Sequence, residues 1–106
     1  MQIEELNTFV ALFDIYGKLL SQKQHDLLEE FLNFNLSESE LAESTNSSRQ
    51  AVHDAITKAK KQLLEFEEKC KVFEERNKLK IKLNDLKNTL TNESEKQIVE
   101  DIIENI

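Results

Sequence analysis

Apolar residues recur at steps of three and four along the start of the chain, which is the spacing of an amphipathic helix. The first series predicts a helix over residues 2–16, and its members are Ile3, Leu6, Phe9, Val10, Leu12 and Phe13. Gly17 follows at the place where a helix commonly ends on a left-handed residue. Ser21 is the expected N-cap of a second helix that ends near residues 33–35. Its apolar side comprises Leu27, Leu28, Phe31, Leu32 and Phe34.

A short helix, a tight turn and another helix are predicted next. Ser37 and Glu40 have the spacing of a capping box and open a helix through residues 41–43. Residues 44–48 then concentrate turn-forming and capping side chains. The following helix begins at Ser47 or Ser48, because Ser47 has a glutamine in capping-box register while Ser48 directly precedes the basic start.

This order of elements is that of a helix-turn-helix motif, in which the second helix packs across the first. Leu41 and Ala42 are expected to form the contact of the supporting helix, and Asn46 is the turn residue that best tolerates a left-handed conformation. The inner face of the second helix is expected to comprise Val52, Ala55 and Ile56.

A heptad-like seam follows from the second helix of the motif. It steps through Val52, Ile56, Ala59, Leu63, Phe66, Cys70 and Phe73, so Cys70 is expected to be buried. The next leucines, at 79, 83, 86 and 90, are out of phase with it, which predicts a break or a rotating stripe near residues 76–77. Asn92 with Glu95 opens a last helix, and segments 79–90 and 94–106 are expected to pair as an antiparallel hairpin.

These patterns predict an all-α protein in which a helix-turn-helix bundle is followed by a long helix and a C-terminal helical hairpin. Proline is absent and Gly17 is the only glycine, which argues against a turn-rich β fold. We expect a helix-turn-helix domain over residues 1–73 and a helical extension over residues 74–106. The extension is a candidate dimerisation element. The sequence leaves open whether the apolar seam packs within the chain or across a homodimer.

The formal net charge of −7 argues against a nucleic-acid binder, but the charge is unevenly distributed. Residues 1–46 carry −7, residues 47–61 carry +3 and residues 62–106 carry −3. The basic segment of this division coincides with the second helix of the motif. Because the rest of the chain would repel DNA, binding is expected to be weak without a partner or a second copy.

Side chains projecting outward from that helix suit groove recognition. Arginine can donate two hydrogen bonds to guanine, glutamine can pair with adenine, and lysines further along can contact phosphates. The candidate nucleic-acid-binding residues are Ser48, Arg49, Gln50, His53, Thr57, Lys58, Lys60 and Lys61. The alternative for this set is an ordinary exposed helix surface, and Lys60 and Lys61 could equally be solvated charges that flank the seam.

Catalytic and metal chemistry is not indicated by the sequence. His25 and His53 lack partners at metal-ligand spacing, one glycine cannot build a phosphate loop, and no nucleophile and base can be paired. We therefore expect no cofactor, no metal and no enzymatic activity. One cysteine and the lack of any long apolar run predict a cytoplasmic protein without membrane insertion.

Residues 19–61, centred on the Ser-Arg-Gln-Ala-Val run at 48–52, resemble region 4 of bacterial sigma factors. Together with residues 12–20, they are more similar still to the YlxM-type helix-turn-helix proteins, which are encoded beside the signal recognition particle GTPase in many low-GC bacteria. The chain departs from that pattern at Asn46 and Ser47, where glycine and an apolar residue are usual, and at His53, where tyrosine is usual. The resemblance implies a sigma-region-4-like domain that regulates or assists the signal recognition particle pathway.

Three functions compete at this stage. The first is a DNA-binding regulator, acting as a homodimer through its second motif helix. The second is an accessory protein that contacts the signal recognition particle, its RNA or its GTPases without binding DNA. The third is a coiled-coil adaptor in which the motif only supports the helical tail.

Overall fold

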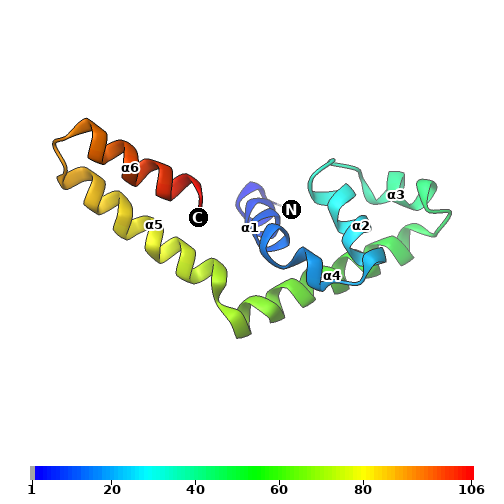
Figure 1. Cartoon of the computed structure of the whole chain (residues 1–106). Coiled ribbons are helices and arrows are strands. Elements are labelled where there is room, and N and C mark those ends of the chain that lie inside the picture. Colours follow the sequence, from blue (N-terminus) through cyan, green and yellow to red (C-terminus); the bar gives the residue numbers. More distant parts are fainter. Residues whose placement is uncertain (1) are drawn as a thin grey trace. The chain divides into compact units, whose positions relative to one another are not determined.

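The computed structural model describes residues 2–106, and within them it contains six α-helices, one short 3-10 helix and no strand (Figure 1). The predicted all-α class is therefore confirmed. The elements are α1 (Ile3–Tyr16), η1 (Gly17–Leu19), α2 (Gln22–Leu32), α3 (Glu38–Ser44), α4 (Arg49–Cys70), α5 (Val72–Thr89) and α6 (Glu93–Glu104). None of the helices in the described part of the chain combines the length and apolar character that a bilayer crossing requires.

The chain divides into two compact units, Met1–Cys70 and Lys71–Ile106. We call them the N-terminal unit and the C-terminal unit. The boundary lies three residues before the one expected after residue 73. At this point Lys71 adopts a left-handed conformation with φ of 55°, which ends α4 and starts a new helix.

In the N-terminal unit, α1, α2 and α3 each pack against α4, which is the longest helix (Figure 1). Each of these four helices contributes one leucine with almost no exposed surface. They are Leu12, Leu28, Leu41 and Leu63. Because burying such a side chain contributes roughly 1.5–3 kcal/mol, these leucines account for much of the packing that holds α3 and α4 in place.

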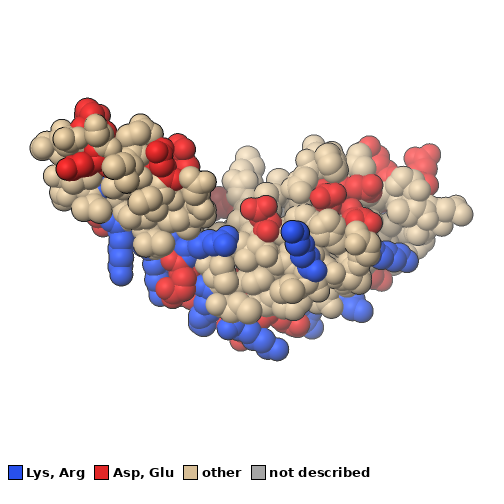
Figure 2. Space-filling view, viewed as in Figure 1, with Lys and Arg blue, Asp and Glu red and all other residues tan. Residues whose placement is uncertain are grey.

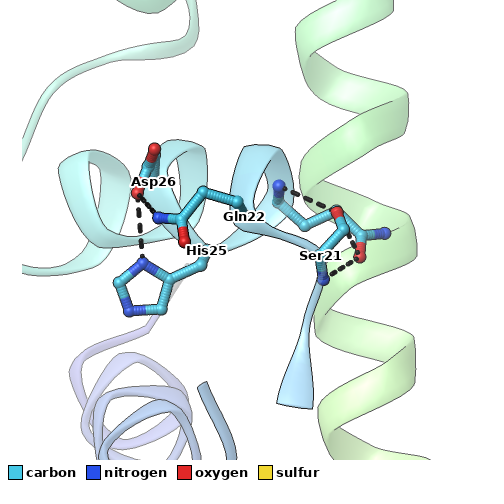
Figure 3. Close-up of polar contacts among 5 residues, drawn as sticks. Ser21, Gln22, His25 and Asp26 are labelled. Carbon is cyan, nitrogen blue, oxygen red and sulfur yellow. Dashed lines mark hydrogen bonds and ion pairs between the residues drawn. The ribbon is translucent and has the colours of Figure 1, made fainter. Parts of the chain in front are cut away.

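Local capping fixes the start of α2, as predicted (Figure 3). The Ser21 hydroxyl accepts a hydrogen bond from the Gln24 amide at 3.2 Å, and the Gln24 side chain accepts one from the Ser21 amide at the same distance. One turn on, Gln22 donates to the Asp26 carboxylate at 2.7 Å, and His25 contacts the same carboxylate at 3.2 Å. The helix therefore begins where the sequence alone indicates.

The expectation that Gly17 is left-handed is wrong. Its φ is −53°, and it continues the chain into η1 while its amide donates to the Phe13 carbonyl. A Cβ atom at this position would lie 3.0 Å from the Phe13 ring. The Phe13 ring lies too close to the backbone for a larger side chain at position 17, and this close approach, not the backbone conformation, explains why the residue is glycine.

The seam predicted through Phe73 is shorter than expected. Val52, Ile56, Ala59 and Leu63 are buried, but Cys70 is exposed, which corrects its predicted burial. Cys70 is the last residue of α4, so it lies beyond the helices that cover the middle of α4. The break predicted near residues 76–77 occurs earlier, at Lys71. Phe34, assigned to the apolar side of α2, lies past its end and is exposed.

The C-terminal unit is a hairpin of α5 and α6, as predicted for its two segments. The Asn92 side chain caps α6 by accepting hydrogen bonds from the amides of Ser94 and Glu95. Lys87 of α5 forms an ion pair with Glu100 of α6. Val99 is the one buried apolar side chain of this unit.

Candidate nucleic-acid interface

The turn between α3 and α4 has a defined geometry. Ser37 and Glu40 form the predicted capping box at the start of α3. Asn46 takes the left-handed conformation, with φ of 53°, and the Ser47 amide donates to the Ala42 carbonyl at 2.9 Å. The Ser48 hydroxyl then accepts from the Ala51 amide at 3.0 Å. Of the two serines left open by the sequence, Ser48 is therefore the one that caps α4.

The supporting contact of the motif also lies where the sequence places it. Leu41 and Ala42 of α3 are buried, as are Val52 and Ile56 of α4, while Ala55 is half-buried. These side chains fix the angle at which α4 crosses α3. The first turns of α4 consequently present their remaining side chains away from the bundle.

Arg49, Gln50, His53 and Thr57 are all exposed on these first turns. Arg49, Gln50 and His53 line one shallow hollow together with Glu38, the first residue of α3. The residues predicted to contact bases thus lie together on one surface, which spans both helices of the motif.

Two carboxylates lie within this surface. The Nδ1 atom of His53 is 2.6 Å from an Oε2 atom of Glu38, and the Gln50 amide donates to Asp54 at 2.9 Å. Both contacts are exposed, so each contributes little to stability and can be exchanged for another partner. Gln50 must release Asp54 before it can pair with a base, and both carboxylates oppose the approach of phosphate.

The predicted lysines do not form a single group. Lys58 and Lys61 are exposed on the outer side of α4. Lys60 instead turns toward α1 and α2, where its Nζ atom lies 5.3 Å from the Phe9 ring centroid and 5.1 Å from that of Phe31. These distances are typical of cation–π contacts.

Burial lowers the pKa of the Lys60 ammonium below its ordinary value, and the carboxylates of Glu5 and Glu38 partly offset this effect. Lys60 is therefore better explained as part of the packing between helices than as a phosphate contact. Its long aliphatic stem covers apolar surface while its charge faces two rings.

Charge separates the surfaces of the N-terminal unit. Figure 2 shows acidic side chains over α2 and α3, and Lys and Arg side chains interspersed with acidic ones along the side on which α4 runs. The acidic residues of those two helices are Asp26, Glu29, Glu30, Glu38, Glu40 and Glu43. Within the N-terminal unit, an approaching polyanion therefore meets basic side chains on the outer side of α4 and mainly acidic ones over α2 and α3.

Ser47 borders an apolar hollow of about 270 Å³ between α2 and α4. Its side chain is exposed and donates to the Thr45 carbonyl at 3.3 Å. Serine thus stands in the turn where the resemblance leads one to expect an apolar residue, and polar side chains of α2 also line the hollow. The apolar lining of the hollow comprises Leu27, Ala51, Val52 and Ala55.

A second basic stretch was missed by the sequence analysis. Residues 76–84 contain four basic side chains and no acidic one, and all four lie in α5. They are Arg76, Lys78, Lys80 and Lys82. The net charge of residues 62–106 as a whole hides this stretch, because the acids of the flanking segments outweigh its bases. A window of about ten residues, roughly three helical turns, would have found them.

Among residues 2–106 there is no group of three or more histidine, cysteine or carboxylate side chains that could hold a metal ion. An arginine and a glutamine project from the start of α4, and two lysines project further along it, so this surface offers hydrogen-bond donors and positive charge.

Comparison with known proteins places the whole chain in one group. Residues 3–105 match the family model described as "Putative helix-turn-helix protein, YlxM / p13 like" (UPF0122). A UPF0122 protein of Fusobacterium nucleatum is 35% identical over 103 residues, which cover 97% of this chain and 100% of the relative. One from Bacillus cereus is 39% identical over 105 residues, covering 94% of this chain and 96% of the relative. One from Clostridium kluyveri is 42% identical over 74 residues, covering 70% and 67%.

Proposed function

The chain belongs to the YlxM/p13-like helix-turn-helix family, and we propose that it is a nucleic-acid-binding regulatory protein that acts in the signal recognition particle pathway. The observation that carries the binding proposal is the exposed set at the start of α4, held by the buried contact of α3. We further propose that it works as a homodimer through its C-terminal unit, since two weak sites bind more tightly together than one.

Binding follows from the usual geometry of the motif, in which the first turns of the second helix enter the major groove. Arg49 can donate two hydrogen bonds to one guanine, and Gln50 can pair with adenine once it leaves Asp54. Lys58 and Lys61 lie further along the outer side and reach phosphates, which position the protein without reading sequence. Ser48 acts by capping the helix that carries these side chains.

A fluorescence-anisotropy titration of mixed-sequence duplex DNA at low salt tests this proposal. We expect Arg49→Glu combined with Lys58→Glu to weaken binding by at least about tenfold, because each lost base contact alone is worth roughly 1–3 kcal/mol. The matched control is Lys18→Glu combined with Lys23→Glu, which changes the net charge equally but at exposed residues of η1 and α2, outside the proposed surface. No binding by the unaltered chain at tens of micromolar, or an equal loss in the control, would refute the proposal.

A second candidate is an accessory protein that contacts the signal recognition particle, its RNA or its GTPases without using DNA. Two carboxylates at the candidate interface favour this second function. Asp54 accepts a hydrogen bond from Gln50 and Glu38 contacts His53, and both carboxylates repel a DNA backbone. The acidic surface over α2 and α3 also suits a basic protein partner.

The two candidates separate in one set of measurements. Both candidates predict that the chain acts in the signal recognition particle pathway. We therefore expect it to be retained in a pull-down with the particle protein, its RNA or its receptor, and to change the rate in a GTPase assay. Competition between particle RNA and duplex DNA for the surface of Arg49 and Lys58 then decides which nucleic acid it prefers. Indifference of all particle components would count against the pathway assignment while leaving DNA binding standing.

A further inference from the structure

The C-terminal unit has an apolar surface that its own two helices do not cover. Val99 is its one buried side chain, although α5 and α6 carry leucines and isoleucines at helical spacing. Four of them are about half exposed: Leu79 at 46%, Leu86 at 48%, Ile98 at 60% and Ile102 at 46%. Clustered apolar side chains with this much exposure form a candidate interaction surface, because exposed apolar patches rimmed by polar residues mark such sites.

These four side chains lie on the same face of the hairpin. Leu79 and Leu86 each precede a half-buried lysine of α5, namely Lys80 and Lys87, and the second of these bonds to α6. Ile98 and Ile102 each precede a residue of α6 with lower exposure. One residue turns a helix by about a quarter turn or slightly more. Seen from one end of the hairpin, the two antiparallel helices turn in opposite senses while their contact faces point toward each other, so both exposed pairs project to one side.

The two helices beneath this face carry opposite charge. Within α5 the basic side chains outnumber the acidic ones by two, whereas in α6 the acidic side chains outnumber the basic ones by four. Lys82 flanks the exposed leucines on the outer edge of α5, and Asp101 flanks the exposed isoleucines on the outer edge of α6. Both are exposed.

Their levels along the hairpin also correspond. Lys82 lies nine residues before Thr91 in the connecting turn, and Asp101 lies ten residues after it. Each helix rises by about 1.5 Å per residue, so the two side chains stand at nearly the same height on opposite edges. A face with this arrangement is complementary to a copy of itself.

We propose that this face binds the same face of a second copy, so that two hairpins form an antiparallel four-helix bundle. The two-fold axis runs along the helices, which lays α5 of each copy against α6 of the other. Leu79 and Leu86 then pack on Ile98 and Ile102 of the second copy, and Lys82 pairs with Asp101 across both edges. The alternative two-fold arrangement would stack α5 on α5 and bring like charges together, which is unfavourable.

This inference specifies the homodimer of the proposed function, but it stands independently of nucleic-acid binding. A two-helix hairpin has only one packing contact and buries little, whereas four helices enclose a core. The partner is a second copy because basic and acidic edges occur together at matching heights.

Sedimentation equilibrium of the full-length chain over micromolar concentrations tests the proposal. The unaltered chain is expected to sediment as a dimer of 12.4 kDa subunits. Lys82→Glu is expected to raise the dimer dissociation constant about tenfold, because it replaces two attractive pairs by two repulsive ones. Adding Asp101→Lys to that variant should restore the original constant. A monomer at all concentrations, or no restoration by the second change, would overturn the proposed arrangement.

Two further variants keep the test independent of folding and of nucleic-acid binding. Leu86→Glu combined with Ile98→Glu should give a monomer whose helical circular dichroism and Arg49-dependent DNA contact persist. Ile81→Glu places the same charge on a side chain that is 63% exposed and outside this face, so it should leave the dimer intact. Arg49→Glu combined with Lys58→Glu should dimerise as the unaltered chain does, even where it no longer binds DNA. Dissociation by Ile81→Glu would contradict the assignment of the face.

Discussion

The N-terminal unit and the C-terminal unit are both made of amphipathic helices, yet they bury very different amounts of apolar surface. Of the fourteen apolar side chains buried within residues 2–106, thirteen lie in the N-terminal unit. The difference lies in the number of helices that meet. In the N-terminal unit α4 is packed by three other helices, whereas α5 is packed by α6 within its own unit.

The comparison teaches that hydrophobic periodicity predicts a helix without predicting that its apolar face is covered. The leucines of α5 and the isoleucines of α6 repeat as regularly as the apolar residues of α4. Val52 and Leu63 are nevertheless buried, while Leu86 and Ile98 remain half exposed. In a hairpin each helix has one neighbour, so half of a wide apolar stripe has no partner within the unit.

The largest effect is expected from a comparison of a buried position of the N-terminal unit with a half-exposed apolar position of the C-terminal unit. Leu41→Ala should lower the free energy of unfolding of the N-terminal unit by about 2–5 kcal/mol, since it removes a fully buried side chain. Ile102→Ala should cost less than about 1 kcal/mol in a monomeric background such as Leu86→Glu with Ile98→Glu. Urea unfolding followed by circular dichroism measures both.

Similar losses at the two positions would break the comparison between the units. Ile81→Ala supplies the control, because its side chain is largely exposed and should change stability by no more than about 0.5 kcal/mol. Ile102→Ala could instead lower the free energy of unfolding only in a chain that can still dimerise. That result would show that the second copy buries this side chain.

A smaller effect is expected at the residue that joins the units. Lys71 holds a left-handed conformation that disfavours side chains with a Cβ atom. Lys71→Gly should therefore stabilise the chain by about 1 kcal/mol, measured as a shift of the urea midpoint. Glu65→Gly, at an exposed position in the interior of α4, is the control and should destabilise by a similar amount. Destabilisation by both changes would mean that α4 and α5 form one continuous helix in solution.

Local features of the fold were predictable from the sequence because they depend on neighbours along the chain. Ser21, Ser37 and Asn92 cap helices where their spacing indicates, and Asn46 takes the left-handed turn position. The break at Lys71 was misplaced, since lysine carries no signal for a left-handed conformation.

Features that depend on distant contacts were not predictable. Gly17 is required by the Phe13 ring that packs against it, a contact that no local rule reveals. Within the candidate site, the exposure of Arg49 and Gln50 followed from helical periodicity. The inward position of Lys60 did not, because it depends on two rings supplied by α1 and α2. Likewise, Glu38 reaches His53 only because α3 packs across α4.

The salt dependence of DNA binding tests the central claim, that the outer side of α4 contacts phosphates, most directly. The logarithm of the binding constant should fall linearly with the logarithm of salt concentration, with a slope of about −0.9 for each phosphate neutralised. Lys58→Ala combined with Lys61→Ala should make that slope shallower by nearly 2, by the same relation. Lys18→Ala combined with Lys23→Ala, in η1 and α2, should leave it unchanged. An unchanged slope in the first variant, or an equal reduction in the second, would contradict the assignment of the interface to α4.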